Sequence, residues 1–276
     1  MNETLKRTLS GAVYIVLLIA SILHSTESFF ILFGILMLIA VVEFCDLVNL
    51  KKVFPIILAI LAYCAFYILK FSRNDDLILL GTTLFVSIKA IFFLFSDKKL
   101  KADITTKYVY LIGYIILPMV LLTKIPFGEK GYNPKIIISI FILIWTNDTF
   151  AYIVGKSIGK HKLYEKISPK KTIEGFIGGI IFTIIAGYLI SKFYFRPSEK
   201  YLEKSVLIWT IIAFIVSVFG TIGDLIESKF KRIAAVKDSG TIMPGHGGIL
   251  DRLDSVIFVA PFVFLFYQIL YYATFS

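Results

Sequence analysis

The stretch that decides the fold class is residues 205–227, which read SVLIWTIIAFIVSVFGTIGDLIE. An uncharged and mostly apolar run extends as far as Gly223, and two carboxylates, Asp224 and Glu227, follow it. A helix needs about 20 apolar residues to cross the hydrocarbon core of a bilayer. The pattern therefore predicts a transmembrane helix whose last turn carries acidic side chains to the membrane surface.

Eight further apolar stretches of similar length lie before and after this one. The nine predicted spans cover residues 8–24, 29–50, 53–71, 77–95, 108–125, 134–155, 173–193, 205–227 and 255–275. The composition agrees, because 58% of the 276 residues are hydrophobic and only 17% are charged. A soluble domain averages about half apolar and a quarter charged residues. We expect an all-α, polytopic integral membrane protein of about nine transmembrane helices, without a separate soluble domain.

The distribution of basic residues predicts which side of the membrane each loop faces. Short loops rich in Lys and Arg usually lie in the cytoplasm. With the N-terminus inside and the spans alternating, 19 of the 29 basic residues face the cytoplasm, 9 face the other side, and Lys89 lies within a span. We therefore expect a multi-pass protein of the cell membrane with a cytoplasmic N-terminus. The polar loops 156–172 and 228–254 then share the cytoplasmic side.

The two halves of the chain differ in where their polar residues lie. Residues 1–133 form almost purely apolar spans, for which packing, lipid access or dimerisation is the expected role. Residues 134–276 carry carboxylates, glycines and lysines at the ends of their spans, and we expect them to hold the chemistry. The net charge of +10 fits anionic lipid head groups or a polyphosphate substrate. Nucleic acid is not an expected partner, because no soluble basic domain is present to bind it.

The first polar cluster begins inside a span, at Asn147 and Asp148. A carboxylate at membrane depth costs a few kcal/mol, so it normally faces a polar interior or water. Asp148 and Tyr152 are four residues apart and share one helix face. A hydrogen bond that only packs two helices together is the alternative interpretation of Asp148.

The second part of this cluster reads SPKKT at residues 168–172, followed by IEG. Pro is tolerated in a first helical turn, and Ser or Thr caps free backbone N–H groups, so this stretch can start a helix. A helix N-terminus with lysines beside it binds anions readily. A solvated basic loop is the alternative. For Gly175, Gly178 and Gly179 we favour close helix packing over a binding role.

The second polar cluster begins at the C-terminal end of the 205–227 stretch. Asp224, Glu227 and Ser228 are spaced i, i+3, i+4 and therefore line one helix face. Asp251 and Asp254 are three residues apart at the start of the last span. Mg²⁺ prefers carboxylate oxygens together with substrate phosphates and waters. Two acidic helix faces at one membrane surface therefore predict a site for a hard cation.

A glycine-rich loop, PGHGG at residues 244–248, connects these two acidic faces. Such a loop lets its backbone approach a phosphate closely. His246 lies within it, and a single His among carboxylates does not make a zinc site. Two interpretations of His246 remain, a hydrogen bond that organises the loop and general acid–base catalysis.

The second cluster resembles the signature of the CDP-diacylglycerol synthases, or phosphatidate cytidylyltransferases. The resemblance is carried by SKFKR at 228–232, KDSG at 237–240 and PGHGGILDRLD at 244–254, with SPKKTIEG at 168–175 and Asn147–Asp148 upstream. It covers residues 145–254, while the N-terminal half adds only Arg7 and Glu43–Phe44. The resemblance implies that a phosphate oxygen of phosphatidic acid attacks the α-phosphorus of CTP and that pyrophosphate leaves. It also implies Mg²⁺, with a second cation as an option, and a homodimer.

The residues and the resemblance together give three sets of predicted roles. Catalytic roles are predicted for Asp224, Asp251, Lys231, Arg232, Lys237, His246 and Arg252. Substrate binding is predicted for Asp148, Ser168, Lys171, Thr172, Ser228, Gly247 and Gly248. The predicted metal ligands are Asp224 and Asp251, followed by Glu227 and Asp254.

Several other classes of membrane protein compete with this interpretation. A CDP-alcohol phosphotransferase needs an Asp-Gly pair, and the sequence contains none. CDP-archaeol synthases and CTP-dependent polyprenol kinases share part of the C-terminal chemistry but use other acceptors. An ion-coupled transporter would use Asp148 and Glu43 as intramembrane relays, yet the polar residues here crowd one membrane face rather than the midplane.

Overall fold

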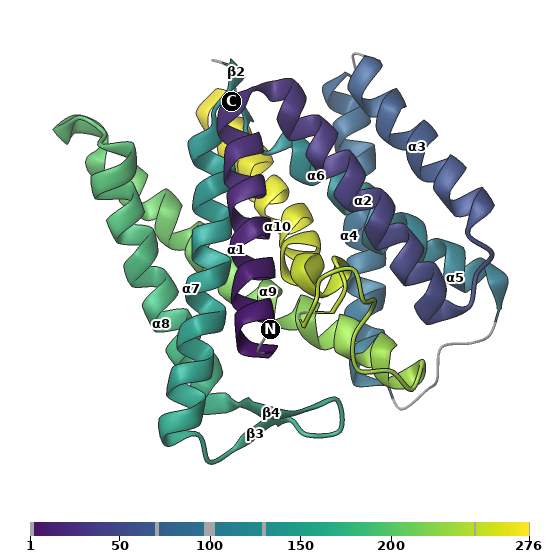
Figure 1. The fold of residues 1–276 in the computed structure, drawn as a ribbon. Coiled ribbons are helices and arrows are strands. Elements are labelled where there is room, and N and C mark those ends of the chain that lie inside the picture. Colours follow the sequence, from purple (N-terminus) through teal and green to yellow (C-terminus); the bar gives the residue numbers. More distant parts are fainter. Residues whose placement is uncertain (1–2, 70–71, 97–102, 129–130, 246, 276) are drawn as a thin grey trace.

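The structure, a computed structural model, describes residues 3–69, 72–96, 103–128, 131–245 and 247–275, and helices dominate them (Figure 1). The α-helices are α1 (Glu3–His24), α2 (Thr26–Val48), α3 (Val53–Ile68), α4 (Arg73–Phe95), α5 (Ile104–Tyr110), α6 (Leu117–Lys124), α7 (Pro134–Ile158), α8 (Ile173–Leu189), α9 (Glu199–Ile233) and α10 (Leu250–Phe275). Two π-helical segments, η1 (Leu111–Ile116) and η2 (Ile190–Phe195), join α5 to α6 and extend α8.

The predicted spans correspond to these helices. Within the described residues, seven helical segments are long and apolar enough to cross a membrane. The apolar part of α1, Thr8–His24, and the helix α3 are shorter apolar helices. The prediction of an all-α, multi-pass membrane protein is confirmed.

Several helix boundaries differ from the prediction, and those of α9 and α10 matter most for the site. Helix α9 spans Glu199–Ile233 rather than 205–227, and α10 begins at Leu250 rather than at residue 255. Hydropathy locates only the part of a helix that lies in hydrocarbon, whereas the backbone hydrogen bonds continue through polar turns beyond it. As a result, Asp224, Glu227 and Lys231 lie on one continuous helix.

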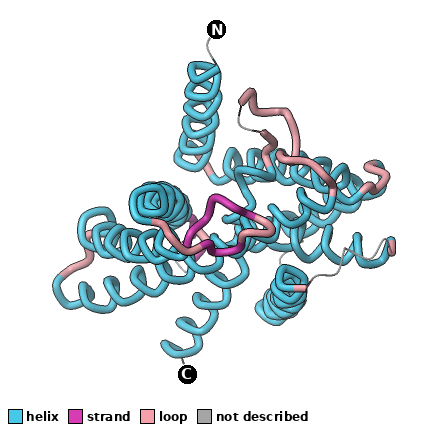
Figure 2. Tube along the Cα trace, turned by 90° about the horizontal axis from the view of Figure 1, so that it is seen from below, coloured by secondary structure: helices cyan, strands magenta, loops and turns pink. Residues whose placement is uncertain are grey.

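Two small hairpins lie at opposite ends of the helical bundle (Figure 1). Strands β1 (Phe127–Gly128) and β2 (Gly131–Tyr132) pair near the C-terminus. Strands β3 (Lys162–Tyr164) and β4 (Ser168–Thr172) pair at the opposite end. Seen from that end, the β3–β4 hairpin lies across the ends of the helices (Figure 2). The loop 234–249 lies at the same end, so the two polar loops share one face of the bundle, as the charge distribution predicts.

The four C-terminal helices pack in chain order, α7 on α8, α8 on α9, and α9 on α10. Small residues allow this close approach. A Cβ at Gly178 would lie 2.7 Å from Val154 of α7, and a Cβ at Gly223 would lie 2.7 Å from the backbone oxygen of Asp254 on α10. Small residues at helix contacts are typical of membrane proteins, where packing rather than water exclusion drives association.

An aromatic cluster joins α9 to the N-terminal helices. The ring of Phe230 lies 5.2 Å from those of Phe44 on α2 and Phe93 on α4, centroid to centroid, and 5.7 Å from Tyr114 of η1. The neighbouring Lys229 is buried and donates to the backbone oxygens of residues 93, 94 and 96 at the end of α4. Helix C-termini carry unpaired carbonyls that attract a cation. Lys229 is therefore a structural anchor of α9.

Candidate active site

A polar cavity of about 800 Å³ opens where the lower ends of α7, α8, α9 and α10 meet the β3–β4 hairpin. Its charged lining residues are Asp148, Lys156, Lys162, Lys170, Lys171, Asp224, Lys231, Asp238, Asp251, Arg252 and Asp254. The uncharged ones include Asn147, Thr172, Gly175, Thr221 and Ser255. Two clusters far apart in the sequence thus face one another across a single space.

Two lysines, Lys171 and Lys231, form ion pairs with carboxylates of this site. Lys171, at the end of β4, forms an ion pair with Asp224 Oδ2 on α9. Lys231 Nζ lies 2.6 Å from Asp251 Oδ1 and also contacts Glu227 Oε2, so it bridges α9 and α10. A carboxylate that is buried without a compensating charge is costly. Each lysine ammonium therefore occupies a position that would also attract another cation.

Asp251 is the most heavily engaged of these carboxylates. Its Oδ2 accepts hydrogen bonds from the backbone N–H of Gly248 at 2.8 Å and of Ser239 at 2.8 Å, and from the Ser239 hydroxyl at 2.9 Å. With Lys231 on the other oxygen, this carboxylate fixes the glycine-rich loop to the start of α10. Gly247 has a φ of +88°, which favours glycine, and a Cβ there would collide with Asp251.

The whole chain resembles a known group of enzymes. Residues 5–270 match the model of the cytidylyltransferase family. The chain belongs to this family. A phosphatidate cytidylyltransferase of Staphylococcus saprophyticus is 50% identical over 123 residues, which is 44% of this chain and 44% of that protein. One of Staphylococcus epidermidis is 44% identical over 135 residues, 49% of this chain and 50% of that protein. The matched stretch spans about half the length of each relative or less.

Asp224 and Asp148 are two accessible carboxylates of the cavity of this cytidylyltransferase-family chain. The Asp224 side chain is 31% exposed and accepts a hydrogen bond from the Ser228 hydroxyl at 3.2 Å. Ser228 therefore orients Asp224 without lining the cavity itself. Asp148, in α7, faces the cavity, so this intramembrane carboxylate meets a polar space as the sequence predicts.

Glu227 and Asp254 are the deepest acidic residues of the site. The Glu227 side chain is fully buried, and no described residue donates a hydrogen bond of good geometry to either of its oxygens. Its one compensating partner among the described residues is the Lys231 ammonium, which it shares with Asp251. Asp254 is buried at the cavity wall and accepts the Ser255 N–H at 2.7 Å.

Sequence reasoning gave Glu43 no part in this site, yet the structure places it directly behind the loop. Glu43 is buried in α2 and accepts hydrogen bonds from the backbone N–H of Ile249 at 3.0 Å and of Leu250 at 2.7 Å. The Ser239 hydroxyl donates to it at 3.0 Å. A carboxylate at a helix N-terminus is stabilised by the free N–H groups there. Glu43 therefore anchors α10, which leaves no free carboxylate there for an ion relay.

The glycines beside Glu43 show how closely its carboxylate approaches the loop. A Cβ at Gly248 would lie 2.6 Å from Glu43 Cδ, and a Cβ at Gly240 would lie 2.8 Å from the same atom. Glycine is needed at both positions because the carboxylate approaches the backbone so closely. The sequence contained the glycines and the buried acid, but nothing in it linked residues about 200 positions apart.

The stretch at residues 168–172 does not start a helix as predicted. Ser168–Thr172 forms strand β4, and α8 begins at Ile173. Pro169 is compatible with this position because a two-stranded hairpin consists only of edge strands. The predicted cap does occur, since the Thr172 hydroxyl accepts the Gly175 N–H at 3.1 Å. Lys170 and Lys171 thus reach the cavity from a strand rather than from a helix turn.

Some predicted site residues lie outside the cavity lining. Arg232 donates to the backbone oxygens of Ile167 and Val236, each at 3.3 Å, and so ties the hairpin to α9. Lys237 is exposed on the loop. Ser168, Gly247 and Gly248 belong to the segments that border the cavity but do not line it. His246 lies outside the described residues.

The described residues do not enclose a metal ion by themselves. Among them, no group of three or more His, Cys, Asp or Glu side chains is arranged to hold one. Mg²⁺ is often held by one or two carboxylates and completed by substrate phosphates and waters. The donor set of Asp224 and Asp251, hard oxygens now facing lysine ammonium groups, fits such a site.

Proposed function

We propose that this chain is a phosphatidate cytidylyltransferase, which converts CTP and phosphatidic acid to CDP-diacylglycerol and pyrophosphate. The observation that carries the proposal is the cavity itself, which gathers six basic and five acidic side chains at one end of an apolar helical bundle. Membership of the cytidylyltransferase family and the names of the relatives support the same chemistry. A lipid phosphate and a soluble triphosphate can meet only at such a boundary.

The reaction needs charge and alignment more than covalent help from the protein. A phosphate oxygen of phosphatidic acid forms a bond to the α-phosphorus of CTP, while the bond from that phosphorus to the bridging oxygen breaks and pyrophosphate leaves. Such transfers are catalysed mainly by positioning and by cations near the developing charge. Lys156, Lys162 and Lys170 are exposed at the mouth and suit the triphosphate. Arg252, exposed at the start of α10, suits a second phosphate.

Mg²⁺ is proposed as the cofactor, with a second cation as an option. Asp224 and Asp251 would hold it, followed by Glu227 and Asp254. The ion would neutralise phosphate charge during transfer. The protein's part is to orient these carboxylates through Ser228, Ser239 and Gly248, and to supply lysines that turn from carboxylate to phosphate when substrates bind.

The placement of the enzyme and its assembly are proposed with it. We place it in the cell membrane with the cavity on the cytoplasmic face, because CTP is cytosolic and the basic loops lie at this end. A homodimer is proposed as well. We propose that residues 134–276 carry the chemistry and that residues 1–133 serve packing, lipid access or dimerisation. The first part has one further role, since its Glu43 anchors the start of α10 in the second.

The decisive experiment measures products from CTP with purified protein in detergent. Phosphatidic acid should cause release of pyrophosphate and formation of CDP-diacylglycerol, and excess EDTA should stop it. A polyprenol acceptor and an ether-linked archaeal acceptor are the controls for the rival enzymes. Release of CDP instead of pyrophosphate, or turnover only with one of the control acceptors, would contradict the proposal. Full turnover in EDTA would contradict the metal.

A further inference from the structure

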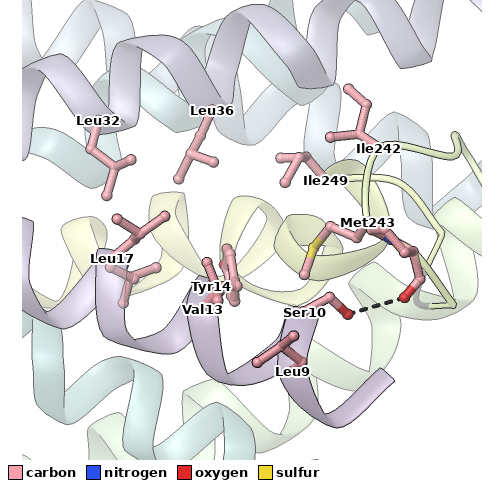
Figure 3. A pocket seen from close by; sticks show the side chains of 12 residues that line it. Leu9, Ser10, Val13, Tyr14, Leu17, Leu32, Leu36, Ile242, Met243 and Ile249 are labelled. Atoms are coloured by element: carbon pink, nitrogen blue, oxygen red, sulfur yellow. Dashed lines mark hydrogen bonds between the residues drawn. The ribbon is translucent and has the colours of Figure 1, made fainter. Parts of the chain in front are cut away.

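A second cavity, apolar and of about 610 Å³, lies between α1 and α2 and reaches the loop 234–249 (Figure 3). Leu9, Val13 and Leu17 line it from α1, and Leu32 and Leu36 line it from α2 (Figure 3). Leu9, Val13 and Leu17 are each at least half exposed, so the groove is open along its length to the outer surface of the bundle. On a membrane protein that surface faces lipid.

The dimensions and walls of the groove match an acyl chain. The lining residues on α1 run from Leu9 to Leu18, which is about 13 Å at 1.5 Å per residue. One leaflet contributes about 15 Å, half of the hydrocarbon core. The groove therefore starts at the loop and is about as long as one leaflet is thick.

The groove is continuous with the loop that shapes the polar cavity. Met243, Pro244 and Ile249 close its inner end, and the Ser10 hydroxyl donates to the Pro244 carbonyl at 3.0 Å (Figure 3). Ile249 is two residues from Asp251, which lines the polar cavity. The same turn of chain thus separates an apolar groove from a charged site.

Midway along its α1 wall, the groove also has one polar atom without a hydrogen-bond partner among the described residues (Figure 3). The Tyr14 hydroxyl is buried, and none of the described residues forms a hydrogen bond with it. It lies within electrostatic reach of Arg252 and Asp254, two lining residues of the polar cavity. A buried hydroxyl without a partner is costly, and a lipid ester or phosphate oxygen at this point would satisfy it.

We propose that this groove holds one acyl chain of the phospholipid substrate, with the head group at the loop end, where only the turn that begins at Ile249 separates the groove from the polar cavity. The inference rests on the proposed function, because it names where the lipid substrate of that reaction lies. It assigns to α1 and α2, which the sequence left with a general role, the recognition of the acyl chain.

The test fills the groove and compares a matched substitution outside it. Val13→Trp fills the groove, while Val16→Trp changes the same residue type on the same helix at a position that is 64% exposed and does not line it. With dioleoyl-phosphatidate in micelles, Val13→Trp should raise the KM for the lipid about tenfold and leave the KM for CTP unchanged. Val16→Trp should match the wild type. Dihexanoyl-phosphatidate, whose chains are short, should show a smaller penalty.

A second measurement does not depend on activity. Phosphatidate with a photoreactive acyl chain should cross-link the wild-type protein to peptides that contain residues 9–18 or 242–249. Cross-links spread evenly over the exposed apolar surface, for example at Phe92 or Ile78, would overturn the inference. So would equal lipid KM values for the two Trp variants.

A change from dimer to monomer in Val13→Trp at wild-type lipid KM would make the groove an interface between two copies instead. Absence of cytidylyl transfer in the wild type would contradict the proposed function, while the cross-links would still decide the groove.

Discussion

The loop 234–249 and the β3–β4 hairpin border the same cavity, but they are held in different ways. Two buried carboxylates, Glu43 and Asp251, fix the loop by accepting backbone N–H groups from it and from the start of α10. The hairpin is fixed by its own strand pairs, such as Lys162 with Thr172, and its lysines stay exposed except for Lys171, which is half-buried against Asp224. Charged groups in and behind the loop therefore set its shape, whereas those of the hairpin are available to a ligand.

This difference leads to different expected consequences of substitution. Changes to the loop anchors should reduce turnover, because they displace the carboxylates that face the reacting phosphates in the proposed reaction. Changes to the hairpin lysines should weaken binding of the triphosphate and leave turnover nearly intact. The expected loss of activity on substitution therefore decreases from Asp251 through Glu43 to Lys170. Which side of the membrane the loop and the hairpin face can be tested by labelling, without a change in activity.

The largest effect is expected for Asp251→Asn. Asn keeps the shape of the side chain but loses the charge that faces Lys231, and one acceptor becomes a donor toward the loop. Removing one such electrostatic element typically costs about 10²–10³ in rate, which pyrophosphate release would measure. Asp103→Asn is the control, because Asp103 caps α5 away from the cavity and Asn caps a helix equally well. Wild-type turnover in both variants would contradict the role of Asp251.

A smaller but still large effect is expected for Glu43→Gln. The amide would direct a donor at the N–H groups of Ile249 and Leu250, which leaves buried donors unpaired at a cost of about 1–3 kcal/mol. We expect kcat to fall about tenfold to hundredfold and the melting temperature to fall, with little change in the KM for CTP. The corresponding acid-to-amide change Asp46→Asn, at a residue that is half-exposed on α2 and paired with Lys52, serves as the control. A Glu43 variant that changed only the KM would contradict an anchoring role.

A moderate effect on binding is expected for Lys170→Ala. Lys170 is exposed on β4 and lines the cavity, so it should contact the triphosphate but not the reacting atoms. A hydrogen bond of this kind contributes about 0.5–1.5 kcal/mol, so the KM for CTP should rise about threefold to tenfold at nearly constant kcat. The effect should shrink at high salt. Lys166→Ala, at the turn of the same hairpin and outside the cavity lining, should leave the KM unchanged. Equal effects of the two variants would indicate a general surface charge.

The last prediction concerns sidedness and requires no change in activity. Cysteines introduced at Lys160 and Lys237, one beside each polar segment, should react from the same side of sealed vesicles because both positions are exposed at one end of the bundle. Cys64 is exposed and should first be replaced by Ser, whereas Cys45 is buried. Labelling from opposite sides would mean that α8 and α9 do not both cross the membrane.

The sequence predicted the helices well because a span is a local property. Whether residues 205–227 can cross a bilayer depends on their own length and hydropathy. The same local reasoning placed Asp224 and Glu227 on one helix face and found Thr172 as a cap. It missed strand β4, because Pro169 and Thr172 are compatible with a helix start as well as with an edge strand.

The sequence by itself therefore determined a multi-pass helical protein, the family to which it belongs and the two polar clusters. The tertiary structure alone decided which charges meet. Lys231 lies between Glu227 and Asp251, Lys171 lies on Asp224, and Glu43 reaches Leu250 across 207 positions of the chain. The physical reason is that hydropathy acts on neighbouring residues, whereas an ion pair or a cap between distant helices exists only after those helices have packed.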